Sequence, residues 1–526
     1  MPIARKVGGI FGIIMAFMTF IALANEVLHN PEPLSPQTPS GLTRSIKPIY
    51  SPSSKETLPY LPHPIAVIEM LEYQLREGML GTLYVVNEPQ IKIAQQAATN
   101  TSADNKPRIH FQRRAVIPIG DKKAVPADNQ PAFKEKQVAN EPMKVIPLSR
   151  SEKLLLSKAQ RFMNDNWNDK TGFIDSVNGY TQTTMWDVGS AISGILALDA
   201  LGVTDNALTQ IRLEKLLSTL MNMPLYDDKL PNRQYNTVTG EPSGPYSRSS
   251  RHGNGWSALD LGRLYIWLAI IKQQKPLLVQ QVDKVTNKWQ LSYAVKDETL
   301  FGIKFTAKGE HFRQEGRLGY LQYAAKGYQL AGLNVDSAYD CDELGEVQVE
   351  GHSLLIDERN LPFFTLDPYL LYAIEVGFTQ ACWFQLSTLY QLHKQHYQRF
   401  EQLKVYAEDS LNRKPWFLYN NIFYQGYAWW SVSSSGQSVP KANTQIFSNK
   451  AAFAMSVLFD DDYAKLLAEQ VIKHSLKHQH VPTGIFSDGK ANIAYNINTN
   501  ALILVSLWFK SRNYTPILSL GSRSLL

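Results

Sequence analysis

The stretch SAISGILALDALG, residues 190–202, decides the fold because it is apolar on nearly every face of a helix. A helix that is apolar all round has to be buried on all sides. The stretches SNKAAFAMSVLF (448–459) and NTNALILVSLWF (498–509) have the same composition. The pattern predicts six buried helices, which begin near residues 184, 255, 316, 367, 447 and 498.

Helices of a second kind alternate with the buried ones and carry charges along one face, as in LTQIRLEKLLSTLM (208–221). Such amphipathic helices belong on a surface. They are predicted at 150–165, 206–222, 277–293, 380–400 and 461–477.

A buried helix followed by a surface helix, repeated around a ring, makes an (α/α)6 toroid. The one clear strand signal is GEVQVEGHSLLIDER (345–359), where apolar and polar residues alternate as in a β-hairpin. This hairpin takes the place of one surface helix. The expected fold class is therefore all-α, a toroid over residues 148–526 with one small β-hairpin insertion.

The N-terminal part has a different character. Arg5 and Lys6 precede a charge-free apolar run over 7–23, and Ala22-Leu23-Ala24 fits the small-x-small pattern of signal peptidase sites. Residues 1–24 are therefore predicted to be a signal peptide or a retained anchor in the inner membrane, two alternatives that the sequence leaves open. The rest of the chain is expected outside the cytoplasm, in the periplasm or cell envelope.

Residues 25–147 are predicted to be a mostly disordered linker, because Pro, Ser, Thr and other polar residues dominate them. One isolated helix is predicted within it, at 64–80, where the apolar residues have helical spacing.

Composition narrows the classes of function. The formal net charge is +6, without a dense run of Lys or Arg, so nucleic acid is not an expected partner. Cys341 and Cys382 are the only cysteines, which excludes a zinc cluster and a thioredoxin-like motif. They can pair in an oxidising compartment if the fold brings them together. P-loop, HExxH and serine-hydrolase motifs are absent, and no metal or cofactor is expected.

Carboxyl groups concentrate in the stretches just before or at the start of the buried helices, which meet at one face of a toroid. Asp187 lies in the first turn of the first buried helix, Glu315 precedes the third, and Asp367 opens the fourth. Capping of helix N-termini is the structural alternative for Asp187, and the following Pro368 makes a cap equally reasonable for Asp367. Asp260 and Arg263, three residues apart, are expected to form a structural salt bridge.

Aromatic, amide and charged side chains near the same helix starts suit a hydroxyl-rich ligand, with ordinary turn and capping chemistry as the alternative. The candidate substrate-binding residues are Trp186, Trp256, Arg251, His252, Arg317, Tyr320, Tyr369, Lys450, Asp488, Tyr495 and Asn498.

Six blocks in order carry a family resemblance: TTMWDVGS, GWSALDLGRL, EGRLGYLQYAAKGY, DPYLLYAIEVGF, FSNKAAFAMSVLF and NINTNALILVSLW. They resemble the bacterial domain-of-unknown-function family 3131 over about residues 150–515. That family is similar to glucoamylase-like (α/α)6 proteins and six-hairpin glycosidases. The resemblance implies glycan metabolism at the cell surface. Leu321 departs from the pattern, because an acidic residue often follows the tyrosine of the GRLGY block.

The expected function is that of an inverting glycoside hydrolase or transglycosylase acting on a β-glucan or exopolysaccharide. Glu315 is the candidate acid, and Asp187 or Asp367 is the candidate base. A non-catalytic glycan-binding or scaffold protein is the main alternative, favoured by Leu321 and the long linker. A polysaccharide lyase that uses Arg251 and His252 is the third.

Overall fold

The computed structural model describes residues 145–518, apart from 343, 360–363, 435–436 and 441–442. The predicted signal segment and nearly all of the predicted linker, with its helix, lie outside the described residues. No described helix is both long enough and apolar enough to cross a membrane.

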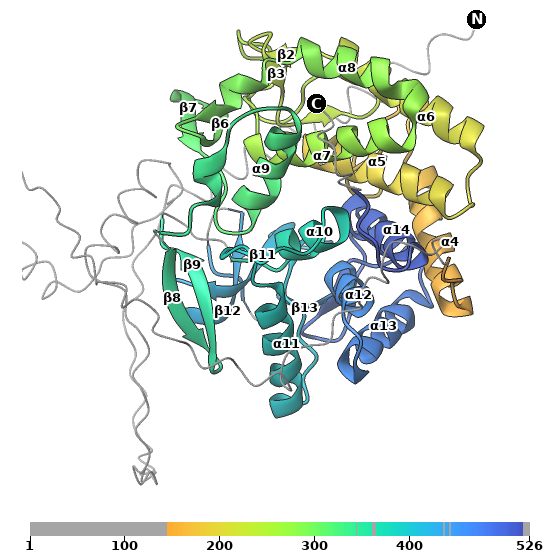
Figure 1. Ribbon diagram of the computed structural model, residues 1–526, viewed down its shortest axis with the longest axis vertical. Coiled ribbons are helices and arrows are strands. Elements are labelled where there is room, and N and C mark those ends of the chain that lie inside the picture. Colours follow the sequence, from red (N-terminus) through yellow and green to blue (C-terminus); the bar gives the residue numbers. More distant parts are fainter. Residues whose placement is uncertain (1–144, 343, 360–363, 435–436, 441–442, 519–526) are drawn as a thin grey trace, which may run out of the picture. The chain divides into compact units, whose positions relative to one another are not determined.

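Six buried helices form a closed ring (Figure 1). Each contacts the next in chain order, and the last contacts the first. The prediction of six buried helices is therefore confirmed. They are α5 (Met185–Ala200), α7 (Ala258–Gln274), α9 (Tyr320–Leu330), α10 (Asp367–Glu375), α12 (Asn449–Leu458) and α14 (Ile497–Ser511).

Amphipathic helices alternate with this ring along the chain, and each buries only part of its residues. They are α4 (Arg150–Asp165), α6 (Asn206–Asn222), α8 (Val279–Lys288), α11 (Leu386–Phe400) and α13 (Asp462–Ser475). Between α9 and α10 the chain instead forms the antiparallel hairpin of β8 (Leu344–Val349) and β9 (His352–Asp357), which contacts α11. The predicted hairpin is thus confirmed at nearly the predicted residues.

The expectation of a single hairpin in an all-α fold was wrong, because the connections around the ring contain several further small sheets. Two of them supply walls of the site described below. One consists of β5 (Val295–Lys296), β6 (Thr299–Thr306) and β7 (Gly309–Gln314). The other consists of β10 (Glu408–Ser410), β11 (Phe417–Tyr424) and β12 (Tyr427–Ser433).

The remaining strands are only two to four residues long, too short for an alternation of apolar and polar residues to reveal them. They are β1 (Gln182–Thr183) with β4 (Tyr235–Asn236), β2 (Leu225–Tyr226) with β3 (Leu230–Pro231), and the sheet of β13 (Gln445–Ser448), β14 (Gly484–Phe486) and β15 (Ala491–Asn492).

A disulfide joins Cys341 to Cys382, whose Cα atoms are 6.4 Å apart. Cys341 lies between α9 and the β8–β9 hairpin, and Cys382 lies between α10 and α11. The bond therefore ties together the two connections on either side of α10, at the point where the ring has no covering helix of its own.

Two glycines allow α7 and α9 to pack unusually closely. A Cβ atom on Gly262 would lie 2.3 Å from the backbone oxygen of Ala324, and one on Gly327 would lie 1.9 Å from the backbone oxygen of Gly262. Real Cβ atoms do not approach backbone so closely, so any larger residue would force the two helices apart.

We expect Gly327→Ala to lower the free energy of unfolding by about 1–3 kcal/mol, as overpacking typically does, despite the better helix propensity of alanine. Gly194→Ala in α5 is the matched control. Its added Cβ would meet chiefly the flexible end of the Met163 side chain, which can move aside. Urea unfolding of both variants is the measurement, and an unchanged midpoint for Gly327→Ala would contradict the close packing.

Candidate functional site

A large cleft, with a volume of about 1750 Å³, opens where the buried inner helices begin. The first turn of each inner helix, or the residues just before it, contributes side chains to its lining. The contributing residues include Asp187, Asp260, Glu315, Asp367, Lys450 and Asn498. The prediction that the loops before the buried helices share one face is therefore confirmed.

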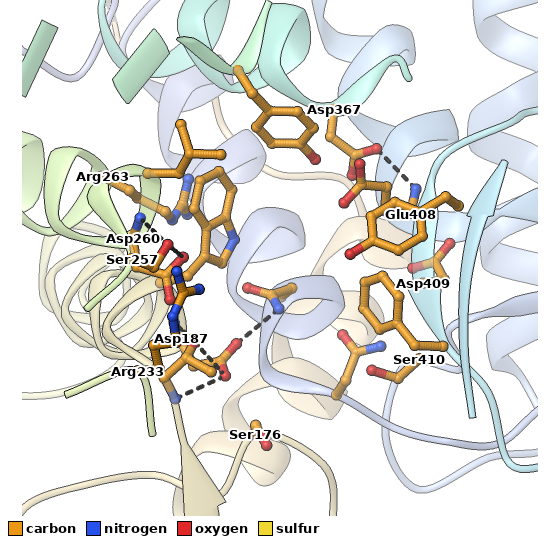
Figure 2. A pocket seen from close by; sticks show the side chains of 18 of the residues that line it. Ser176, Asp187, Arg233, Ser257, Asp260, Arg263, Asp367, Glu408, Asp409 and Ser410 are labelled. Atoms are coloured by element: carbon orange, nitrogen blue, oxygen red, sulfur yellow. Dashed lines mark hydrogen bonds between the residues drawn. The ribbon is translucent and has the colours of Figure 1, made fainter. Parts of the chain in front are cut away.

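One wall of the cleft carries Asp187, Asp260 and Arg233 (Figure 2), together with Glu315. Glu315 forms an ion pair with Arg233, and its Oε2 accepts a hydrogen bond of 2.7 Å from the backbone N–H of Ala258, the first residue of α7. Gly302 makes room for this carboxylate, because a Cβ there would lie 2.1 Å from the Glu315 Cδ. Both carboxylate oxygens of Glu315 are therefore engaged by protein donors.

Asp187 helps to cap the N-terminus of α5, which the sequence left open as the structural alternative to a catalytic role. It forms a capping box with Thr184 at the start of α5, where its Oδ2 accepts 2.9 Å from the Thr184 hydroxyl. Its Oδ1 accepts 2.9 Å from the amide of Asn498. Burial raises the pKa of Asp187, while the hydrogen bonds from Thr184 and Asn498 oppose that rise.

Asp260 is the half-buried carboxyl of this wall and accepts 2.8 Å from the hydroxyl of Ser257. Burial raises its pKa to about 7; the hydrogen bond from Ser257 and the charge of Arg233 oppose the rise, and the charges of Glu315 and Asp187 add to it. The predicted salt bridge between Asp260 and Arg263 is wrong, because Arg263 forms its ion pair with Glu375 instead.

The opposite wall carries Asp367, Glu408 and Asp409 (Figure 2), with Lys450 between them. The ammonium of Lys450 lies 2.7 Å from Asp367 Oδ1 and 3.5 Å from Asp409 Oδ1. Asp367 is not the cap of α10, since Leu366 occupies that position. Its Oδ2 instead accepts 2.9 Å from the backbone N–H of Glu408.

Glu408 is the most strongly perturbed carboxyl of this wall. Burial, followed by the negative charge of Asp367, raises its pKa to about 8, and Lys450 opposes the rise. Burial also raises the pKa of Asp409, to about 6, again against the charge of Lys450. A carboxyl with a pKa in this range is a candidate proton donor at neutral pH.

A buried ion pair supports the floor between the two walls. Arg263 Nη1 lies 3.1 Å from Glu375 Oε1, and both side chains are almost fully buried. Tyr323 accepts 2.6 Å from Arg263 and donates 2.5 Å to Glu375. The guanidinium also lies 4.8 Å from the ring centroid of Trp186, which lines the cleft.

The sequence of the whole domain identifies the family. Residues 157–513 match the family described as "Protein of unknown function (DUF3131)". The chain belongs to this family. No curated protein sequence matches the chain.

Solved structures place this DUF3131 chain among glucoamylase-like (α/α)6 folds. A candidate glucoamylase from Bacteroides caccae is 12% identical with a TM-score of 0.52, over 69% of this chain and 95% of that one. An endo-β-1,2-glucanase from Chitinophaga pinensis, in complex with sophorotriose and glucose, is 10% identical with a TM-score of 0.51, over 70% and 94%. At these identities the similarity establishes the fold alone.

Several predicted site residues of the DUF3131 chain do line the cleft. They include the three carboxyls that the sequence predicted to be catalytic, Asp187, Glu315 and Asp367. The others are Trp186, Arg317, Tyr320, Lys450 and Asn498. Leu321 is 2% exposed, packs in the core and is not among the residues that line the cleft.

The other predicted binding residues lie elsewhere. Trp256 is buried and donates 3.0 Å to the backbone oxygen of Phe301, and Tyr369 is buried against Trp383. Arg251, on the exposed loop that also carries His252, pairs with Asp227 and lies 3.8 Å from Glu310, and neither Arg251 nor His252 lines the cleft.

Asp488 and Tyr495 are likewise not among the lining residues. Asp488 pairs with Arg413, and the hydroxyl of Tyr495 bonds to His478. Their contacts hold loops in place.

Sequence reasoning missed Glu408 and Asp409. The only local signal is two adjacent acids, in AEDS (407–410), after an apolar segment. Their partners Asp367 and Lys450 are about 40 residues away in either direction. Among the described residues, no group of three or more His, Cys, Asp or Glu side chains is arranged to hold a metal ion.

Proposed function

We propose that this protein is a glycoside hydrolase or transglycosylase that acts with inversion on a β-glucan or exopolysaccharide. The observation that carries the proposal is the pair Asp260 and Glu408, two carboxyls with raised pKa values on facing walls of one cleft. Glycosidic cleavage needs two such groups, one to protonate the leaving oxygen and one to act from the other side of the sugar.

Glu408 is assigned as the acid in place of Glu315, because both carboxylate oxygens of Glu315 already accept from protein donors, Arg233 and the backbone N–H of Ala258. Glu408 gives its proton to the glycosidic oxygen as the bond to the anomeric carbon breaks. Asp260 accepts a proton from the water, or from the acceptor hydroxyl, that forms the new bond. Asp187 and Asp367 were the bases expected from sequence. In this proposal Asp187 caps α5, and the charge of Asp367 raises the pKa of Glu408.

The proposal predicts a bell-shaped dependence of kcat/KM on pH. Asp260 must be charged to act as a base, so activity should rise as pH increases through about 7. Glu408 must be protonated, so activity should fall as pH increases through about 8. An optimum near pH 5, with little activity left at pH 7.5, would instead assign the reaction to carboxyls of ordinary pKa.

The direct test is to incubate the full-length protein with a panel of linear and branched β-glucans and bacterial exopolysaccharides. Release of reducing ends supports the proposal, and NMR of the first product distinguishes inversion from retention. Saturable binding without any product supports the alternative, a non-catalytic glycan-binding or scaffold protein. Neither cleavage nor binding of any glycan overturns both.

We also propose that the protein works outside the cytoplasm, in the periplasm or cell envelope. Support comes from the apolar run at 7–23 and from the Cys341–Cys382 disulfide, since such bonds persist in oxidising compartments. Fractionation of cells, with N-terminal sequencing of the recovered protein, tests export and decides between cleavage and anchoring.

A further inference from the structure

Exposed aromatic rings that line the cleft include Tyr180, Phe312 and Trp416, and the last two belong to the segments that form the proposed catalytic walls. Phe312 lies on β7, which leads directly to Glu315 on the Asp260 wall. Trp416 lies between β10, which holds Glu408, and β11. Phe312 is 46% exposed and Trp416 is 60% exposed. Rings of this size are normally covered, so their exposure inside a cleft points to a ligand.

Phe312 is held rigidly from behind. Its ring stacks on that of Phe301, with centroids 4.9 Å apart and planes 29° apart. Phe301 is its neighbour on β6, because Phe301 pairs with Gln314 and Ile303 pairs with Phe312 in the β6–β7 ladder. One face of Phe312 is therefore covered by protein, and its exposed area belongs to the remaining surface of the ring.

Trp416 is presented by a strained but well-fixed turn. Its φ is +71°, a left-handed conformation that is costly for a bulky residue. Its N–H donates 2.9 Å to the oxygen of Arg413, and its oxygen accepts 2.8 Å from the N–H of Leu411. Arg413 in turn stacks 3.4 Å from the ring centroid of Phe486 and pairs with Asp488. Strain that surrounding contacts maintain in this way is characteristic of functional sites.

We propose that Phe312 and Trp416 are two stacking platforms for the sugar rings of one glucan chain, on the two walls that carry Asp260 and Glu408. This inference rests on the proposed function and narrows its substrate. A pyranose with equatorial substituents presents a flat C–H face to an aromatic ring, as gluco-configured units do. A glucan long enough to contact both platforms should therefore bind more tightly than a short one that contacts a single ring.

The test is equilibrium binding of β-linked gluco-oligosaccharides of increasing length to the full-length protein, in the Glu408→Gln background so that the ligands persist. Sophoro-, laminari- and cello-oligosaccharides are the probes. Affinity should rise with length, and Phe312→Ala or Trp416→Ala should weaken binding of the longest ligands about tenfold, the upper range of one aromatic contact. Binding of the disaccharides should change less.

Conservative and remote variants separate this role from a structural one. Phe312→Tyr and Trp416→Tyr keep a ring and should restore most of the affinity. Tyr427→Ala is the matched control, because Tyr427 is 54% exposed and stacked on Trp430 but lies outside the cleft. The Tyr427→Ala variant should bind the long oligosaccharides as tightly as the Glu408→Gln parent protein does.

Each further outcome is decisive. If both alanine variants bind the long oligosaccharides as tightly as the parent does, the platform proposal is overturned, whether or not wild type cleaves glycans. If they lose affinity but Tyr427→Ala loses it equally, the effect is not local to the cleft and the platforms are again rejected. If wild type cleaves a glycan that Trp416→Ala binds normally, the proposed function stands alone. If the parent binds none of these oligosaccharides and wild type cleaves no glycan, both proposals fail.

Discussion

The Glu408→Gln variant should lose about 10²–10⁴-fold in kcat on any glycan that the wild-type protein cleaves, the usual contribution of a positioned general acid. The glutamine amide fills the same space but cannot protonate the leaving oxygen. Binding of the glycan should change little, because the proton is transferred only in the transition state. The measurement is the initial rate of reducing-end release, with substrate affinity determined in parallel.

Two further carboxyl variants make this result specific. Glu310→Gln is the matched control, since Glu310 also lines the cleft but contacts Tyr226 and Arg251 at its edge. It should keep most of the activity. Glu315→Gln tests the assignment expected from sequence: if it abolishes turnover at unchanged stability while Glu408→Gln remains active, the acid is Glu315 and the present assignment is wrong.

Glu375→Gln should lower the free energy of unfolding by about 3–5 kcal/mol, because it leaves the buried guanidinium of Arg263 without its anionic partner. The Arg263 side chain is almost fully buried, so its charge must be compensated largely by protein groups. Urea unfolding of the full-length protein, followed by tryptophan fluorescence, measures the change.

An exposed ion pair provides the control for this second prediction. Asp462 and Lys465 lie 3.0 Å apart, with Asp462 fully exposed, so Asp462→Asn should leave the unfolding midpoint nearly unchanged. Replacing both Arg263 and Glu375 by Met and Leu should recover part of the lost stability, since an apolar pair leaves no buried charge. A Glu375→Gln protein as stable as wild type would show that Arg263 does not depend on this partner.

The ring of helices could be predicted because a helix with apolar residues on every face must be buried, and this can be recognised from its composition alone. α5 and α14 contain long runs of apolar and small residues, and no distant partner is needed to recognise that they are covered. Helix ends were less predictable. α11 begins at Leu386, six residues after the predicted start, because the segment before it forms the connection that carries Cys382.

The site was only partly predictable, because its chemistry depends on contacts between segments distant in sequence. Arg263 lies three residues from Asp260, yet its partner Glu375 comes from another inner helix. The environment of Glu408 likewise comes from Asp367 and Lys450. Trp256 directly precedes Ser257, which lines the cleft, but the Trp256 ring is buried in the core. The position of a residue near a helix start does not reveal which way its side chain points.

The single disulfide has a consequence for how the protein is produced. With only two cysteines in the chain, oxidation within one molecule has one product, so no intramolecular mispairing can form. The competing reaction is cross-linking between two molecules, which depends on concentration. Refolding by dilution should therefore favour the native bond without a disulfide isomerase. Dimers that appear on a non-reducing gel but not on a reducing gel would identify a preparation that was oxidised at too high a protein concentration.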